Sequence, residues 1–449
     1  MKNLILKFAP VFFQNLAITL FNSYQYMIRR SGRYRNYRNY FSYFDDKDAE
    51  VILGEQSRRL AEFLEYAKKN SKYYSKICGS ELSDFPILEK VTLLEKLDEI
   101  STVEESNSIV SLTGGTTGAS MKVLYTKEDI QERHAILDHF RAGYGYTLGC
   151  KVAWFSGKDL TRPKDLVRGI CYRDDWINKI RFFSTFHINS KNFRAYWDAF
   201  LEFSPEFLVG FPSSVYELCL LAKENGYKYN GMVKAFFPTA ETVLPVHREV
   251  ISEVLGCPLV DQYASSEGAP FILQCSKGRL HIHSLTGVFE VVDSEMRPAK
   301  EGEILVTSFS TRGTPLIRYR IGDRIKLSGD DEVCECGCSF PMVDYIDGRS
   351  SDYIFSPDNG RVNLGNLSNC TKDAPGIMCF QMVQEDPERV VVNIVKGAQF
   401  TPDDERKFLG SMRKRLGQSM EIDLVYVDSI PREKSGKFRM VKNNLNLKN

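Results

Sequence analysis

The chain has 449 residues, of which 43% are hydrophobic and 26% charged, so it is long enough to bury a large core and to form two or more domains. Its 59 Lys and Arg nearly balance 58 Asp and Glu, and a formal charge of +1 provides no general attraction to nucleic acid. The eleven cysteines are mostly scattered through apolar contexts, which favours a reducing compartment, so we expect a cytoplasmic protein.

The first predicted element is a helix within residues 1–21, where an apolar run precedes a basic stretch. Polar residues and a proline interrupt this run, namely Lys7, Pro10, Gln14 and Asn15. Because no small-residue cleavage pattern follows, we expect a buried or interfacial amphipathic helix instead of an export signal or a membrane span. Five arginines between residues 29 and 38 predict a solvated basic face, which is also compatible with weak peripheral contact with an anionic membrane.

A loop rich in glycine and threonine follows a predicted helix over residues 48–70 and joins two short apolar runs that we expect to be strands. Gly114, Gly115 and Gly118 allow successive backbone amides to turn toward one point, where threonine hydroxyls and the charge of Lys122 complement an anion. The spacing matches neither a P-loop, whose lysine directly follows the last glycine, nor the Rossmann fingerprint. The loop therefore predicts a phosphate site of another class, or else an ordinary glycine turn.

An α/β pattern occupies the middle of the chain, after a helix predicted over residues 127–145 that opens with a capping box at Thr126 and Asp129. The expected strands cover residues 151–156, 205–211, 234–241 and 258–268, and the helices between them residues 213–226 and 245–256. This order predicts an α/β fold with a largely parallel sheet. Glu241 and Glu267 follow such strands, at positions where polar residues are expected to face a ligand crevice.

The last third of the chain changes character twice. Short strands with tight turns over residues 287–329 predict an antiparallel or barrel-like section. A small βαβ-type domain follows, with strands at residues 389–397 and 421–430 around a helix at residues 402–418. Gly348 lies in a polar stretch that contains further glycine and proline, and we place the domain boundary there.

Four residues outside the loop carry charges that suit a nucleotide site. Glu267 can hold Mg²⁺ against phosphate oxygens, or it caps a turn. Asp323, at a turn with Gly322, can accept hydrogen bonds from ribose hydroxyls, or it pairs with a neighbouring arginine. Arg349 lies at the expected hinge, and Lys437 lies on a glycine-containing loop, where a solvated surface lysine is the ordinary alternative.

Taken together, LTGGTTGASMK, AET, YASSEG, YRIGD, GRSSD and PREKSGK resemble, in order and approximate spacing, the motifs of the adenylate-forming enzyme superfamily. Over nearly its whole length the chain is similar to the phenylacetate–coenzyme A ligase-like branch, including capsule-biosynthesis members of the CapK type. The resemblance implies a large adenylation domain at residues 1–347 and a small, mobile α+β lid domain at residues 348–449. It also implies ATP-dependent activation of a carboxylic acid as acyl-AMP, with release of pyrophosphate and transfer to coenzyme A.

The resemblance also implies roles for individual residues. Lys437 is expected to bridge the carboxylate and the α-phosphate, while Glu267 holds Mg²⁺ and Asp323 binds the ribose. The remaining expected contacts with ATP are Thr113, Gly115, Thr116, Thr117, Gly118, Lys122, Glu241, Tyr263, Ser265 and Arg349. The positive charges of Lys437, Lys122 and Mg²⁺ suit this chemistry, because a carboxylate that attacks an anionic phosphorus needs positive charge to offset the repulsion.

Two groups of cysteine and histidine suggest a metal centre. Cys275 precedes His281 and His283, and Cys334 precedes Cys336. Thiolates with an imidazole suit tetrahedral Zn²⁺, although the C-x-C spacing is tighter than in most zinc fingers. Because the sequence is similar to zinc-containing members of the branch, a structural zinc ion held by Cys275, His281, Cys334 and Cys336 is expected. A loop of free thiols is the alternative.

The acyl acceptor stays open at this point. Coenzyme A is the usual acceptor in the family, and capsule-type relatives suggest an amine or a hydroxyl group of a sugar instead. A noncatalytic scaffold that retains the fold is a third hypothesis, but a degenerate copy has no reason to keep both Glu267 and Lys437. We expect a small carboxylic acid as the partner, and no nucleic acid.

Overall fold

The computed structural model describes residues 9–112, 122–157, 160–329, 332–349, 353–364, 367, 369–371, 373–374, 376–433 and 438–445. The chain divides into two compact units, each built from segments that are distant in sequence. The first unit comprises Met1–Thr19, Gly149–Leu259 and Asp347–Asn449, and the second comprises Leu20–Leu148 and Val260–Ile346. The expected division into domains at residues 1–347 and 348–449 stays a prediction.

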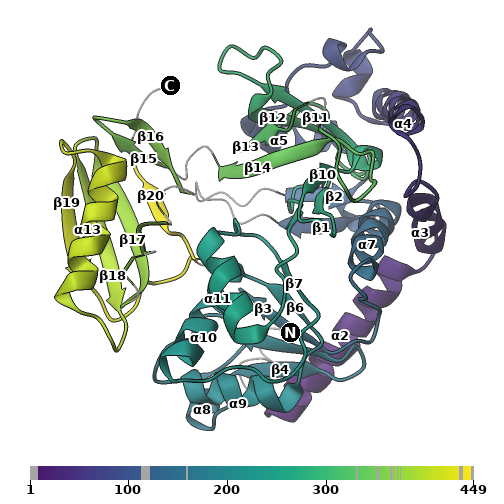
Figure 1. Cartoon of the computed structure of the whole chain (residues 1–449). Helices are drawn as coiled ribbons and strands as arrows, with labels where there is room; N and C mark the ends of the chain where they lie inside the picture. The colour runs from purple at the N-terminus through teal and green to yellow at the C-terminus, as the bar shows by residue number, and fades with distance from the viewer. Residues whose placement is uncertain are drawn as a thin grey trace. The chain divides into compact units, whose positions relative to one another are not determined.

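A five-stranded sheet forms the centre of the first unit, in the order β4-β5-β3-β6-β7 (Figure 1). The strands are β3 (Val152–Ser156), β4 (Tyr172–Asp175), β5 (Ile180–Ser184), β6 (Phe207–Gly210) and β7 (Ala235–Pro238). The helices are α8 (Pro163–Val167), α9 (Phe193–Phe203), α10 (Pro212–Glu224) and α11 (Pro245–Leu255). All neighbouring strands pair in parallel except β4, which pairs with β5 in antiparallel orientation. The predicted α/β fold with a largely parallel sheet is confirmed.

Aromatic side chains fill the core between this sheet and its helices. Phe155 and Phe183, on neighbouring strands, stack with ring centroids 4.8 Å apart, and both are fully buried beside Trp197 of α9. At the end of β6, Gly210 has a φ of +138°, and a Cβ atom there would lie 1.9 Å from the carbonyl oxygen of Phe155. Only glycine fits so close to the neighbouring strand.

The C-terminal part of the first unit contains a second sheet, in the order β19-β18-β17-β20. Its strands are β17 (Ile377–Asp386), β18 (Arg389–Lys396), β19 (Glu421–Tyr426) and β20 (Val441–Asn443), and β15 (Tyr353–Ser356) and β16 (Gly360–Asn363) form a separate hairpin. Helix α13 (Pro402–Leu416) lies across one face of the sheet (Figure 1). Because β18 and β19 pair in parallel around α13, the predicted βαβ unit is confirmed. The long strand β17, which forms a hairpin with β18, was not predicted.

The second unit contains a seven-stranded sheet in the order β11-β12-β13-β14-β10-β9-β8. Its strands are β8 (Gln262–Tyr263), β9 (Ile272–Gln274), β10 (Leu280–Ile282), β11 (Gly287–Val292), β12 (Glu301–Ser308), β13 (Tyr319–Leu327) and β14 (Met342–Arg349). Strand β12 pairs with β11 and with β13 in antiparallel orientation, as β9 does with β8 and β10, and β10 does with β14, which confirms the predicted antiparallel section. The expected strand over residues 258–268 is wrong in extent, because only β8 forms there and the residues after Tyr263 make a turn.

The remaining elements of the second unit surround this sheet. Strands β1 (Ile109–Leu112) and β2 (Lys122–Tyr125) form on the two sides of the glycine-rich loop, as predicted, and they pair in antiparallel orientation. The helices are α3 (Tyr34–Tyr43), α4 (Ala49–Asn70), α5 (Lys90–Glu95), α6 (Leu97–Ile100) and α7 (Lys127–Ala142). Thr126 and Asp129 cap α7 reciprocally, as predicted.

Helix α2 (Val11–Arg30) begins in the first unit and ends in the second. Short 3₁₀ helices occupy several connections, at Tyr74–Lys76, Leu82–Asp84, Glu105–Asn107, Ser284–Thr286 and Asn369–Thr371. Among the helices that the structure describes, none combines the length and the apolar character needed to cross a membrane.

Candidate functional site

The strands on either side of the glycine-rich loop both bind the turn that carries Glu267. The hydroxyls of Ser111 in β1 and Tyr125 in β2 donate hydrogen bonds of 3.0 and 3.1 Å to the carbonyl oxygen of Ser266. Burial raises the pKa of Tyr125 to about 12, so its hydroxyl stays a donor at neutral pH. The expected loop ligands Thr113, Gly115, Thr116, Thr117 and Gly118 lie outside the described residues. The two strands that flank the loop are therefore bonded to the residue directly before the expected magnesium ligand.

Arg133, from α7, fixes the same turn. Its guanidinium donates to the carbonyl oxygens of Gly268 at 2.9 Å and Ala269 at 3.1 Å, and to the hydroxyl of Ser310 at 3.1 Å. It also lies 4.7 Å from the ring centre of Phe271. Sequence reasoning missed Arg133, because it belongs to no motif and acts on backbone far along the chain. The only signal was the unusual number of charged residues in a helix that turns out to bury several of them.

The hydroxyl of Ser265 shapes this turn from within. It accepts hydrogen bonds from the amides of Gly268 at 3.2 Å and Ala269 at 3.1 Å. Gly268 has a φ of +107°, and a Cβ atom there would lie 2.6 Å from the hydroxyl of Tyr125. The sequence after β8 therefore turns instead of extending, and the expected contact of Ser265 with the nucleotide stays a prediction.

Tyr263 and Asp323 form a direct pair. The Tyr263 hydroxyl donates a 2.6 Å hydrogen bond to Oδ2 of Asp323. Asp323 lies where the register between β12 and β13 shifts, next to Gly322 with its φ of +88°, so the expected turn is a bulge inside a strand. The arginines nearby are paired with glutamates, Arg318 with Glu290 and Arg320 with Glu303.

Lys122 opens β2 directly after the glycine-rich loop. Its Nζ atom lies 2.6 Å from a carboxylate oxygen of Glu105, and the Lys122 and Glu105 side chains are 37% and 58% exposed. Exposed pairs of this kind contribute little to stability, because water solvates both charges well. Lys122 can therefore exchange Glu105 for a phosphate at small energetic cost.

Glu241, at the end of β7 in the first unit, binds two segments. Its carboxylate accepts hydrogen bonds from the amide and hydroxyl of Ser213, at 3.1 and 3.0 Å, and from the amide of Phe438 at 2.9 Å. Desolvation raises the pKa of Glu241. Ser213 lies in the first turn of α10, and Phe438 directly follows Lys437, which lies outside the described residues. The residue expected in the nucleotide pocket therefore holds the chain next to the expected catalytic lysine.

Arg432 makes a second contact between the C-terminal part of the first unit and helix α10. Its guanidinium donates to the Ser213 hydroxyl at 3.1 Å and to the Glu217 carboxylate at 2.9 Å. The residues on both sides of the segment that contains Lys437 are thus attached to α10 and to Glu241. Arg349, the expected hinge arginine, ends β14, and its side chain lies outside the description.

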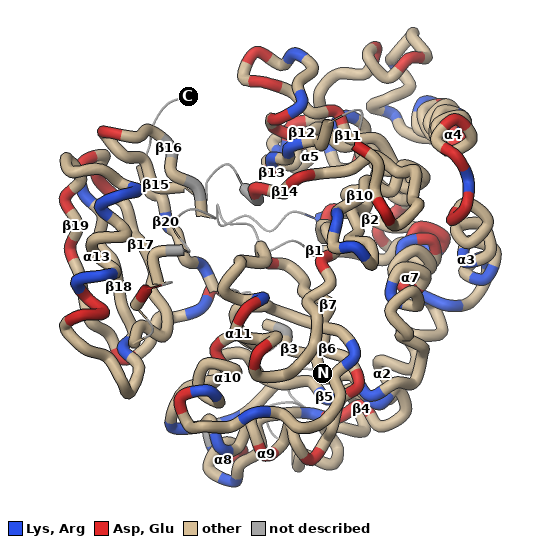
Figure 2. The backbone as a smooth tube through the Cα atoms, viewed as in Figure 1, with Lys and Arg blue, Asp and Glu red and all other residues tan. Residues whose placement is uncertain are grey.

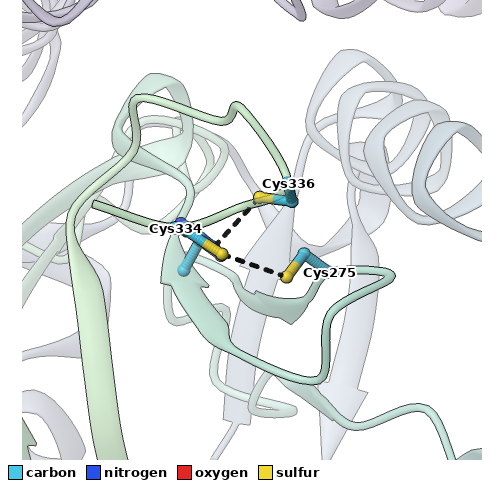
Figure 3. Close-up of side chains that lie close together, drawn as sticks. Cys275, Cys334 and Cys336 are labelled. Carbon is cyan, nitrogen blue, oxygen red and sulfur yellow. Dashed lines mark hydrogen bonds between the residues drawn. The ribbon is translucent and has the colours of Figure 1, made fainter. Parts of the chain in front are cut away.

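The four expected zinc ligands come together in the second unit. One ligand atom from each of Cys275, His281, Cys334 and Cys336 lies within 4.8 Å of the others. The Sγ atoms of Cys275 and Cys334 are 3.7 Å apart, which is too long for a disulfide, and Cys336 Sγ lies 3.6 Å from His281 Nε2. Figure 3 shows the three thiols turned toward one another.

These distances fit a tetrahedral zinc site. Bonds of about 2.3 Å to sulfur and 2.0 Å to nitrogen place neighbouring ligand atoms about 3.5 to 3.8 Å apart. His281 Nδ1 lies 2.9 Å from the carbonyl oxygen of Phe340, which orients Nε2 toward the thiols. Glycines with positive φ, Gly278 and Gly337, close a turn after each cysteine group. His283 is a core residue that lies 4.4 Å from the Phe340 ring, and burial lowers its pKa to about 3.

Two comparisons with known proteins relate the chain to CapK. Residues 354–444 match the family model of the CapK C-terminal domain. Over 99% of its length the chain is 29% identical to the whole of protein CapK from Staphylococcus aureus. It is also 23% identical to indoleacetate–lysine synthetase from Pseudomonas savastanoi, over 71% of this chain and 78% of that protein.

A solved structure supports the fold. The chain superposes on 2-hydroxyisobutyryl-CoA ligase, solved in the postadenylation state with R3-HIB-AMP, with a TM-score of 0.70. The two are 18% identical, and the match covers 88% of this chain and 89% of the ligase. The predicted fold of the adenylate-forming enzymes is therefore confirmed.

Proposed function

We propose that this chain, a homologue of CapK with the fold of the adenylate-forming ligases, uses ATP to activate a carboxylic acid. One observation carries the proposal. Ser111 and Tyr125, in the two strands that flank the glycine-rich loop, donate hydrogen bonds to the carbonyl oxygen of Ser266, directly before Glu267. A phosphate loop and a magnesium carboxylate must act on the same phosphate oxygens, so they need a fixed relative position.

In the proposed reaction, an oxygen of the substrate carboxylate forms a bond to the α-phosphorus of ATP, and the bond from that phosphorus to pyrophosphate breaks. Both reactants are anionic, so positive charge must surround the reacting atoms. Lys122 and the loop amides are assigned to the phosphates, and Lys437 to the carboxylate and the α-phosphate. Glu267 would hold Mg²⁺, which neutralises phosphate charge when it is bound.

The pair of Tyr263 and Asp323 is assigned to the ribose. The hydrogen bond from Tyr263 holds the Asp323 carboxylate in one orientation. A carboxylate so fixed can accept hydrogen bonds from ribose hydroxyls without losing much side-chain entropy when ATP binds. This assignment predicts that the two residues affect ATP binding more than the chemical step.

Coenzyme A is the first proposed acceptor, because the matching solved structure is a CoA ligase. Transfer would form a thioester to the acyl group while AMP leaves and the thiol proton is lost. An amine is the second candidate, because the similarity to indoleacetate–lysine synthetase extends over 71% of the chain. A sugar hydroxyl is the remaining alternative within the same chemistry.

The proposed lid, residues 348–449, would move between the two half-reactions. The contacts of Arg432 with Glu217 and of the Phe438 amide with Glu241 hold one arrangement of this segment on α10. Motion of the lid requires both contacts to break. Lys437 lies between Arg432 and Phe438 in the sequence.

Isotope exchange between pyrophosphate and ATP tests the proposal. Purified protein is incubated with ATP, Mg²⁺ and single carboxylic acids from a panel of aromatic, hydroxy and fatty acids. We expect exchange that depends on one class of acid. Absence of exchange with every acid, while ATP still binds, would support a scaffold protein instead. The active acid is then offered with coenzyme A or with amines, and mass spectrometry identifies the thioester or the amide.

A further inference from the structure

Helix α2 packs on the protein with its polar side. Gln14, Asn15 and Thr19 are buried, with 0%, 6% and 3% of their surface exposed. Gln14 Oε1 accepts a 2.6 Å hydrogen bond from Arg173, Asn15 accepts one from the Asp174 amide, and Thr19 accepts one from the Trp176 amide. Buried polar groups need such partners, and here the antiparallel edge strand β4 and the residue after it supply them.

The opposite side of α2 is apolar and faces solvent. Seven of its residues form what we call the apolar stripe: Phe12, Phe13, Leu16, Leu20, Phe21, Tyr24 and Met27, each between 37% and 68% exposed. Most of them recur at intervals of three or four residues, so they share one face of the helix. Trp176 and Ile177, after β4, are 44% and 65% exposed, and the Trp176 ring lies 5.3 Å from that of Phe12. A soluble monomer rarely leaves so many large apolar side chains together in water.

The charge around the stripe is one-sided. Residues 1–44 contain seven Lys and Arg and no Asp or Glu, whereas the rest of the chain contains 52 Lys and Arg against 58 Asp and Glu. Figure 2 accordingly shows basic and no acidic positions along α2 and α3. Arg30 and Arg33 pair with Asp138 and Glu128 of α7. Among the described residues, no acidic side chain forms an ion pair with the exposed Arg35.

We propose that the apolar stripe docks on an anionic lipid bilayer, with α2 lying in the plane of the interface. The stripe would enter the boundary between headgroups and acyl chains, while the exposed Arg33 and Arg35 meet anionic headgroups. Tyr24 and Trp176 suit this depth, because their rings combine an apolar body with a polar group. A second copy of the chain fits less well, since it would bring two basic segments together.

Sedimentation with lipid vesicles tests this inference independently of the proposed enzymatic activity. The full-length protein is mixed with vesicles of phosphatidylglycerol and phosphatidylcholine, or of phosphatidylcholine alone. We expect binding to the anionic vesicles that weakens at 0.5 M salt, because charges are then screened over about 4 Å. Replacing Phe13→Ser together with Leu20→Ser should weaken binding about tenfold, from the apolar area removed.

A matched double variant supplies the control. Val91→Ser with Met232→Ser changes two equally exposed apolar residues outside α2, which are 63% and 76% exposed, and should bind vesicles as the parent does. Arg35→Glu should weaken binding to the anionic vesicles about tenfold through charge reversal. All three variants should keep the thermal midpoint of the parent, because the altered side chains are exposed.

Several results would overturn the proposal. These are failure of the parent to bind anionic vesicles, equal binding by the Phe13 and Leu20 double variant, and equal binding to neutral vesicles at all salt concentrations. Light scattering at the same protein concentration can give a further result that would overturn the proposal. A stable dimer that the Phe13 and Leu20 double variant dissociates would assign the stripe to a second copy instead of a membrane.

Discussion

The hydroxyl of Tyr263 in β8 lies 2.6 Å from the carboxylate of Asp323 in β13. These strands are four places apart in the sheet order β13-β14-β10-β9-β8. In a flat sheet, strands four places apart are separated by about 19 Å, which two side chains cannot bridge with one hydrogen bond. The sheet must therefore curl strongly, and this curvature brings two motifs that are distant in sequence to one place.

Substitutions in this pair should act on ATP binding. Asp323→Asn removes the negative charge that we assign to the ribose hydroxyls, and we expect the KM for ATP to rise about tenfold or more, with a smaller change in kcat. Tyr263→Phe removes only the orienting hydrogen bond, and we expect a rise of about threefold to fivefold. Pyrophosphate exchange at varied ATP concentration measures both. An unchanged KM in the two variants would remove the pair from the ribose site.

Glu267→Gln should weaken the dependence on magnesium. A neutral amide is a poorer ligand for a hard cation, so half-maximal exchange should require at least about tenfold more Mg²⁺. Glu295→Gln, at a largely exposed glutamate in the same unit, is the matched control and should behave as the parent does. Identical magnesium titrations for the Glu267 variant and the parent would show that another residue holds the ion.

Lys437→Ala should impair formation of acyl-AMP far more than binding of ATP. The lysine is assigned to charge that develops during attack, and losing one such donor lowers the rate by about 10²- to 10³-fold. Single-turnover assays measure the rate, and fluorescence titration measures ATP affinity. Lys414→Ala, an exposed position on α13, is the control. A variant that loses affinity and rate together would show a role in uniform binding instead.

Purified protein should contain about one zinc ion per chain, because four ligands complete a tetrahedron. Cys334→Ser should lose the metal and lower the melting temperature by on the order of 5 to 10 °C. Cys78→Ser, at an exposed cysteine in the same unit, is the matched control and should keep both the metal and the melting temperature. Metal analysis and thermal unfolding decide the matter. A fully stable metal-free parent, prepared without chelator, would contradict the zinc assignment.

Asp165 should make stability depend on pH near β4. Burial opposes its ionisation, but hydrogen bonds from Arg162 and Arg173 outweigh burial and lower its pKa to about 2. Because the folded pKa lies below the usual value, the stabilisation is present at neutral pH and is lost as pH falls from about 5 through 2. Asp165→Asn should lower the free energy of unfolding by about 1 to 2 kcal/mol at pH 7 and by about half as much at pH 3. Urea unfolding at the two pH values tests this. An equal difference in the free energy of unfolding between variant and parent at pH 7 and pH 3 would contradict it.

Local patterns predicted most of the fold. The helix expected at residues 402–418 forms as Pro402–Leu416, because Thr401 caps its start and apolar residues recur on one face. The strand expected over residues 258–268 fails because Ser265 binds backbone amides ahead of it and folds a turn. Such competition between a side chain and a strand ladder does not appear in hydrophobic periodicity.

Candidate site residues could be predicted where residues of one site lie close together in the sequence. The expected zinc ligands form two short groups in the sequence, and the structure brings these four residues together. Arg133 and Arg432 were missed, because each acts on groups more than a hundred residues away along the chain. The expected role of Glu241 stays a prediction, and its contact with the Phe438 amide depends on tertiary structure alone.

Helix α2 covers the edge strand β4, so removing the helix should change how this edge behaves. The side chains of Asn15 and Thr19 accept hydrogen bonds from the amides of Asp174 and Trp176, at the β4 edge of the five-stranded sheet. A bare edge strand pairs readily with the edges of other molecules. A chain that begins after Arg30 would expose this edge, so self-association into aggregates should follow even in the absence of lipid.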